Sequence, residues 1–140
     1  MAFSNIMKAL ATLPLLGLAA PTIAETSDCP FQGVWKSDTA RTLADIGAGK
    51  GLSPSETNAF SYDLFGHMIH EWTCTELRAW FDFDPRPDPI AFRITQATPK
   101  SVSVTFPDGE EADLRLIFEG ECYKIRFASK TFHEYLCPSR

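Results

Sequence analysis

The side chains of this chain that could bind a metal ion are its histidines and the carboxylates beside them. His67, His70 and Glu71 lie close together in the sequence, and His133 is followed by Glu134. In an extended strand, residues 67 and 70 point to opposite faces, so their imidazoles cannot share one ion. The HExxH pattern of zinc proteases does not occur. The sequence therefore predicts neither a metal site nor a cofactor.

Nucleophilic catalysis has no clear candidate in the sequence either. No serine lies in the Gly-x-Ser-x-Gly context of an activated hydroxyl nucleophile. The cysteines are expected to be oxidised, which removes the thiolate that a cysteine nucleophile needs. We therefore expect a protein that is not an enzyme.

The cysteines predict a disulfide framework. Four are present, Cys29, Cys74, Cys122 and Cys137, and all follow an apolar leader. An even number in a secreted chain indicates two disulfides, for which counting alone allows three pairings. No CxxC pair occurs, which disfavours a structural zinc site.

The leader has the features of a cleavable signal peptide. Lys8 supplies a positive charge, and residues 9–20 form an apolar run that is short for a membrane span and contains Pro14. We expect residues 1–24 to be removed by cleavage after Ala24, leaving one domain over residues 25–140. A secreted or periplasmic location follows, with no membrane span in the mature chain.

The remaining chain alternates as β-strands do. After a first strand at 31–37, Asp38 and the Ser53-Pro54-Ser55-Glu56 box predict the starts of two short helices. Period-two alternation then dominates, with turns between the runs. The expected strands are 31–37, 67–74, 77–83, 90–95, 102–106, 112–118, 123–127 and 132–137. The fold class is therefore mainly β: an antiparallel up-and-down barrel of about eight strands, with two helices between its first and second strands.

Strand directions suggest how the cysteines pair. With alternating strands, all four cysteines fall at one end of the barrel, opposite the helices. In the last hairpin, Cys122 lies across from Cys137, and Cys29 can then reach Cys74. The alternative pairing joins Cys29 to Cys137 and Cys74 to Cys122, because the first and last strands also meet in a closed barrel.

The strand faces give two sets of candidate binding residues. Inward-facing side chains could line a lumen, in which His70 and Glu134 would either hold the polar end of a ligand or satisfy each other. Outward-facing aromatic and basic side chains either suit a protein interface or are covered by the two helices or by the proline-rich loop at 85–89. The lumen candidates are Trp35, His70, Trp72, Phe81, Phe92 and Glu134, and the interface candidates are Trp80, Arg126 and Tyr135.

Net charge excludes one class of partner. The chain carries a formal charge of −5 at pH 7. A surface of that sign does not attract phosphate backbones by its long-range field, so no nucleic-acid partner is expected.

Several short motifs resemble the calycin superfamily. Gly33-Val34-Trp35 is similar to the Gly-x-Trp of lipocalins, and the helices between the first two strands resemble the lid of fatty-acid-binding proteins. Trp35-Lys36-Ser37, Leu52-Ser53-Pro54 and Phe65-Gly66 resemble small secreted bacterial lipocalin-like proteins. The resemblance implies a calycin-like barrel that binds a small ligand. The lipocalin Thr-Asp-Tyr motif is missing, and Arg126-Phe127-Ala128 departs from the Arg-x-Tyr of fatty-acid-binding proteins.

The sequence therefore leaves two alternative functions open. The first is a lipocalin-like binding protein for a small apolar or amphipathic ligand, held in the lumen. The second is a protein-binding module of the cell envelope, an inhibitor or immunity-type partner, whose barrel is filled by its own side chains. The state of the interior distinguishes them, because about eight strands enclose just enough space for either.

Overall fold

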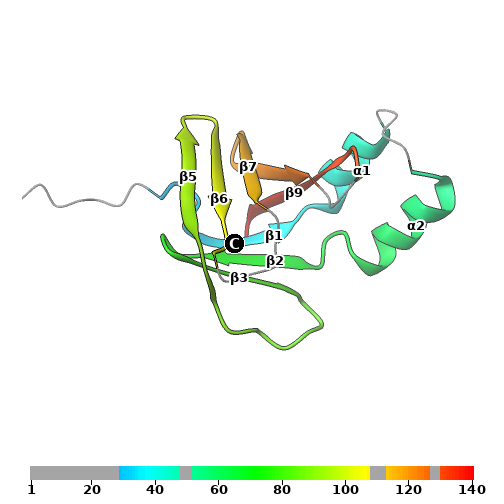
Figure 1. Ribbon diagram of the computed structural model, residues 1–140. Coiled ribbons are helices and arrows are strands. Elements are labelled where there is room, and N and C mark those ends of the chain that lie inside the picture. Colours follow the sequence, from blue (N-terminus) through cyan, green and yellow to red (C-terminus); the bar gives the residue numbers. More distant parts are fainter. Residues whose placement is uncertain (1–28, 48–51, 108–112, 127–129) are drawn as a thin grey trace, which may run out of the picture.

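The computed structural model describes residues 29–47, 52–107, 113–126 and 130–140. The predicted signal peptide and its cleavage point lie outside these residues. The described chain forms a single antiparallel sheet of nine strands with two helices (Figure 1). The elements are β1 Gly33–Ser37, α1 Thr39–Gly47, α2 Pro54–Asp63, β2 Met68–Trp72, β3 Glu76–Phe81, β4 Ile90–Ala91, β5 Arg93–Thr98, β6 Ser101–Thr105, β7 Leu114–Glu119, β8 Cys122–Arg126 and β9 His133–Pro138.

The sheet curls into a nearly closed barrel. Its strand order is β4-β3-β2-β1-β9-β8-β7-β6-β5, so its two edge strands are consecutive in the chain. β4 pairs with Glu76 and Leu77 of β3, and after Phe92 the same stretch continues as β5 and pairs with β6. Phe92 itself donates its backbone N–H to the carbonyl oxygen of Thr75. One bent segment therefore joins both edges, and the predicted strand at 90–95 appears as two strands. The predicted mainly-β antiparallel barrel is confirmed.

The two helices lie between β1 and β2, as predicted. α2 begins with a complete capping box: the Ser53 hydroxyl accepts from the Glu56 N–H, and the Glu56 carboxylate accepts from the Ser53 N–H. Asp38 caps α1 by accepting from the Arg41 N–H at 2.9 Å. Within the described residues, neither helix combines the length and the apolar character that a membrane span needs.

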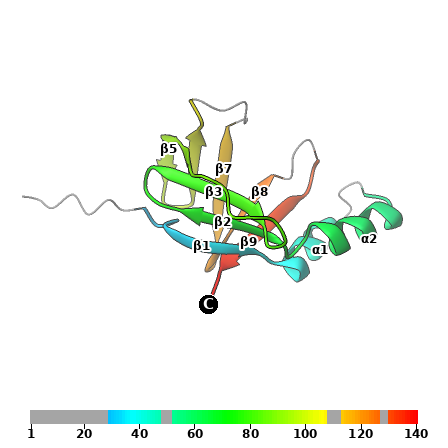
Figure 2. The same cartoon turned by 90° about the horizontal axis from the view of Figure 1, so that it is seen from below.

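The helices, which we call the helix pair, pack on the barrel from one end. Both views place them beyond the end of β1, away from β5 (Figures 1 and 2). Ile46, Phe65 and Phe132 form a small apolar cluster there, separate from the core of the barrel. Two α1 side chains also bind the backbone of β9: Thr42 accepts from the Tyr135 N–H at 3.1 Å, and Asp45 accepts from the His133 N–H at 2.8 Å.

Both disulfides follow the pairing predicted from the strand register. Cys29 is bonded to Cys74 and Cys122 to Cys137, with Cα–Cα separations of 5.7 and 4.3 Å. The expectation that they share one end of the barrel is wrong. Cys137 pairs with Lys36 near the helical end of β1, whereas Cys29 precedes the other end of that strand. The stagger of strands in a barrel, which alternating directions do not reveal, accounts for the offset.

Gly66 tests how closely the connection after α2 approaches the start of α1. Its φ of +87° lies in the left-handed region, and a Cβ there would lie 2.4 Å from the Thr39 Oγ1. We predict that Gly66→Ala lowers the free energy of unfolding by about 2 kcal/mol. Urea denaturation measures this change.

Gly47→Ala is the matched control, because a Cβ at Gly47 meets no atom within 4 Å. It should leave the midpoint unchanged or slightly raised. Equal stability of Gly66→Ala and the wild-type protein would contradict the close approach of Gly66 to Thr39.

Candidate functional site

The barrel interior is filled by its own side chains. The buried inner-face residues form one cluster, and Leu116, Tyr123 and Leu136 have no exposed surface. Aromatic rings contact one another across this space: Trp35 lies 4.8 Å from Tyr123 and Trp72 lies 5.2 Å from Phe92, between ring centroids. The interior is therefore a packed core, and the lumen that the strand pattern allowed is occupied by side chains.

Polar atoms in this core bind one another. The Tyr123 hydroxyl lies 2.7 Å from the Nδ1 of His70 and accepts from the indole N–H of Trp72 at 3.0 Å. The indole N–H of Trp35 donates to the carbonyl oxygen of Phe31 at 2.7 Å. Buried donors with partners avoid the penalty of about 1–3 kcal/mol that an unsatisfied group carries. These bonds therefore fix how the aromatic rings pack.

Burial sets the protonation of this network. It lowers the pKa of His70 to about 4 and raises the pKa of Tyr123 well above its usual range. Both groups are therefore neutral at pH 7. A neutral imidazole that carries its proton on Nε2 lets Nδ1 accept from the Tyr123 O–H, while the oxygen of Tyr123 accepts from Trp72.

Glu134 lies on the inner face of β9, where its exposed fraction is 2%. Its carboxylate accepts from the Ser37 hydroxyl at 2.7 Å, and the oxygen of Ser37 accepts from the Gly66 N–H at 2.9 Å. Burial raises the pKa of Glu134 to about 7, although the bond from Ser37 acts in the opposite direction. The hydrogen bonds of His70 and Glu134 go to different residues, so they do not form the direct pair considered from the sequence.

The structure buries most of the predicted lumen residues. Trp35, His70, Trp72, Phe92 and Glu134 are all buried, in positions already occupied by contacts to their neighbours. Phe81 is only partly buried and stacks on Phe83, with their ring centroids 5.3 Å apart. Strand alternation predicts that these side chains point inward, but it does not predict that they fill the space between them.

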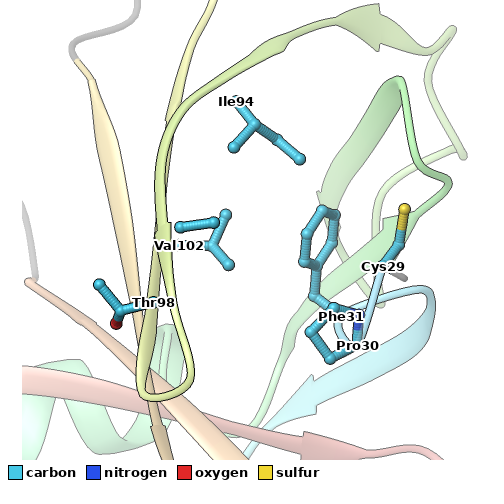
Figure 3. A pocket seen from close by; sticks show the side chains of 7 residues that line it. Cys29, Pro30, Phe31, Ile94, Thr98 and Val102 are labelled. Atoms are coloured by element: carbon cyan, nitrogen blue, oxygen red, sulfur yellow. The ribbon is translucent and has the colours of Figure 1, made fainter. Parts of the chain in front are cut away.

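An apolar pocket lies outside this core, between β5 and the turn that precedes β1 (Figure 3). Its volume is about 390 Å³. Phe31 and Val102 form its inner wall and also belong to the barrel core. We call it the β5 pocket; its lining residues are Cys29, Pro30, Phe31, Ile94, Ala97, Thr98 and Val102.

A β-bulge in β5 builds one wall of the pocket. Ile94 pairs with Val104, and Ala97 pairs with Val102. An advance of three residues along β5 therefore corresponds to an advance of two residues along β6. Ile94 and Ala97 would face opposite sides of a regular strand, but the extra residue places both opposite inward-facing valines. The sequence gives no signal for this bulge, and these lining residues were therefore not predicted.

The other wall is held by a covalent bond. Cys29 is joined to Cys74, and the Gln32 N–H donates to the carbonyl oxygen of Cys29 at 3.0 Å. These bonds hold Pro30 and Phe31 against the barrel. The polar group of the lining, the Thr98 hydroxyl, accepts from the Ser101 N–H at 3.0 Å within the β5–β6 turn.

The predicted interface residues do not form one exposed surface. Tyr135 is buried, with its backbone bound to α1 and the Lys124 ammonium 5.6 Å from its ring centroid. Of the two possibilities for Tyr135, the covered one is observed, because α1 packs on β9. Trp80 is half-buried, whereas Arg126 is exposed and donates to the carbonyl oxygen of Lys130.

Among the residues that the structure describes, no three His, Cys, Asp or Glu side chains lie close enough to hold a metal ion. Comparison with protein-family models, with curated proteins and with solved structures finds no match. The functional interpretation therefore depends on the geometry of the β5 pocket and of the filled core.

His70 predicts a pH dependence of stability. Its pKa falls from an unfolded value of 6.5 to about 4, so the folded protein binds fewer protons than the unfolded chain between these pH values. Stability contributed by neutral His70 is therefore present above pH 6.5 and is lost as the pH falls towards 4. We predict that the free energy of unfolding of the wild-type protein, relative to that of His70→Asn, falls by about 1.4 kcal/mol for each unit by which the pH decreases from 6.5 towards 4.

Urea denaturation of both proteins at pH 4.5, 5.5 and 6.5 measures this difference. Taking the difference between the two proteins cancels the contributions of carboxylates that they share. A difference that stays constant with pH would contradict a neutral, buried His70.

Proposed function

We propose that this protein binds a small apolar or amphipathic molecule in the β5 pocket and performs no catalysis on it. The observation that carries this proposal is the pocket itself, about 390 Å³ in volume and lined mainly by apolar side chains. Ligand pockets of proteins commonly have volumes of about 300–1,000 Å³ and apolar walls. The ligand lies against the outside of the packed core.

The construction of the pocket favours ligand binding. One wall is fixed by a disulfide and the other belongs to a strand paired with β6. Walls that are already ordered reduce the entropy lost when a ligand binds. The inner wall consists of core side chains, so a ligand would extend the apolar contacts of Phe31 and Val102.

The proposed location is secreted or periplasmic. Two disulfides are consistent with an extracytoplasmic protein, since such bonds persist in oxidising compartments. The apolar leader with its small-residue ending points in the same direction. The proposed class is a lipocalin-like protein, supported by the Gly33-Val34-Trp35 motif and the barrel with helices after its first strand.

A second candidate function is binding of an envelope protein, as an inhibitor or immunity-type partner. The filled interior favours it, because such a module needs no lumen. Half-buried Trp80 and exposed Arg126 remain available for contacts of this kind. Failure of the wild-type protein to bind any apolar probe would favour this candidate.

Ala97→Trp tests the pocket directly. The indole would occupy the space beside Val102 and Phe31, so we predict at least a tenfold loss of affinity for N-phenyl-1-naphthylamine, a neutral apolar fluorophore. Titration followed by fluorescence or calorimetry measures the affinity.

Gln96→Trp is the matched control, since Gln96 pairs with Ser103 and does not line the pocket. It adds the same side chain to the same strand and should keep the wild-type affinity. Equal binding by Ala97→Trp and the wild-type protein would show that the probe binds elsewhere.

A further inference from the structure

Glu134 lies at the junction of two apolar clusters. Phe132, the residue before β9, belongs to the cluster of the helix pair, and Leu136 of β9 belongs to the barrel core. Glu134 lies between them in the sequence and on the same face of β9 as Leu136. A carboxyl group at this position separates two surfaces that would otherwise form one continuous core. Such a group is costly to bury and calls for a physical explanation.

Hydrogen bonds connect this carboxyl group to both ends of the helix pair. Ser37, which donates to Glu134, is the last residue of β1, and one residue, Asp38, separates it from α1. Gly66, which donates to the oxygen of Ser37, lies in the connection from α2 to β2. The chain therefore enters and leaves the helix pair through residues bound, directly or through Ser37, to one carboxyl group. The close approach of Gly66 to Thr39 brings these two points together.

Among the residues that the structure describes, the surroundings of Glu134 offer a hydrogen bond but no charge that lowers its pKa. β8 presents Tyr123 and Ile125 on the same face, β2 presents neutral His70, and β1 presents Ser37. α1 contributes Thr42 and Asp45, which bind the β9 backbone on either side of Glu134. Burial raises the pKa of Glu134, and the only opposing influence is the Ser37 hydrogen bond.

We propose that Glu134 is a proton-controlled switch that couples the charge of its carboxyl group to the packing of the helix pair on the barrel. With the carboxyl group protonated, the helices pack closely and bury it. Once ionised, the carboxylate gains by reaching water, because among the described residues the group that hydrogen-bonds to it is the neutral hydroxyl of Ser37. The route to water is movement of the helix pair, whose ends are held by Ser37 and Gly66.

The direction of the effect follows from the two protonation equilibria. The closed junction has a carboxyl pKa of about 7, and an open junction restores the ordinary value near 4.5. Closure is therefore favoured below pH 4.5 and weakens as the pH rises to 7, above which the effect levels off. The equilibrium constant for opening should rise by about tenfold per pH unit between pH 5 and pH 7.

Hydrogen exchange of the wild-type protein tests this switch. Protection factors, which already correct for the intrinsic pH dependence of exchange, should fall by about tenfold per pH unit for amides of α1 and α2 between pH 5 and pH 7. Amides of β6 and β7 serve as the internal reference and should keep their protection. Helix protection factors that do not change with pH would overturn the proposal.

Glu134→Gln keeps the acceptor for Ser37 but cannot ionise, so its helix protection should be independent of pH. Glu121→Gln is the matched control, because Glu121 is exposed and pairs with Arg140. It should behave like the wild-type protein. If Glu134→Gln does not fold, a carbon-13 NMR titration of Glu134 in the wild-type protein decides: a pKa near 7 supports the switch, and a pKa near 4.5 overturns it.

Discussion

The structure depends on the buried hydroxyl of Tyr123. Tyr123 lies on β8, and its hydroxyl binds His70 and Trp72 of β2. In the sheet, β1 and β9 lie between β8 and β2. These hydrogen bonds therefore cross the interior of the barrel. Loss of the hydroxyl would leave the Trp72 N–H unsatisfied at a cost of about 1–3 kcal/mol. The rings of Tyr123, Trp72 and Trp35 are thereby held in place, and the described inner-face side chains pack against one another in the core.

The two candidate functional features lie at opposite ends of the barrel. At one end, the turn before β1 and the bulged strand β5 leave an apolar pocket on the surface of the core. At the other end, Glu134 and Ser37 separate the core from the helix pair. The buried His70 does not lie beside the helix pair as Glu134 does. It lies within the core, where its neutral form is hydrogen-bonded to Tyr123. His70 and Glu134 therefore have opposite effects: neutral His70 favours the fold at high pH, and neutral Glu134 favours it at low pH.

Local patterns in the sequence predict much of this fold. Alternation gives the strands, the Ser53–Glu56 box gives the start of α2, and the register of the last hairpin gives the Cys122–Cys137 pair. The remainder depends on packing between distant residues. The bulge at β5, the stagger that brings Cys137 beside Lys36, and the burial of Tyr135 under α1 have no local sequence signal. Tyr123 and Ser37 did carry a signal, as polar side chains on otherwise apolar strand faces.

We propose that the protein binds a ligand beside the core and not within it. Methyl-labelled protein with bound N-phenyl-1-naphthylamine tests this through NMR contacts between the probe and individual methyl groups. We predict nuclear Overhauser effects to Ile94 and Ala97, which line the β5 pocket. Effects to Leu116 and Leu136, which have no exposed surface, would place the probe inside the barrel and contradict the account.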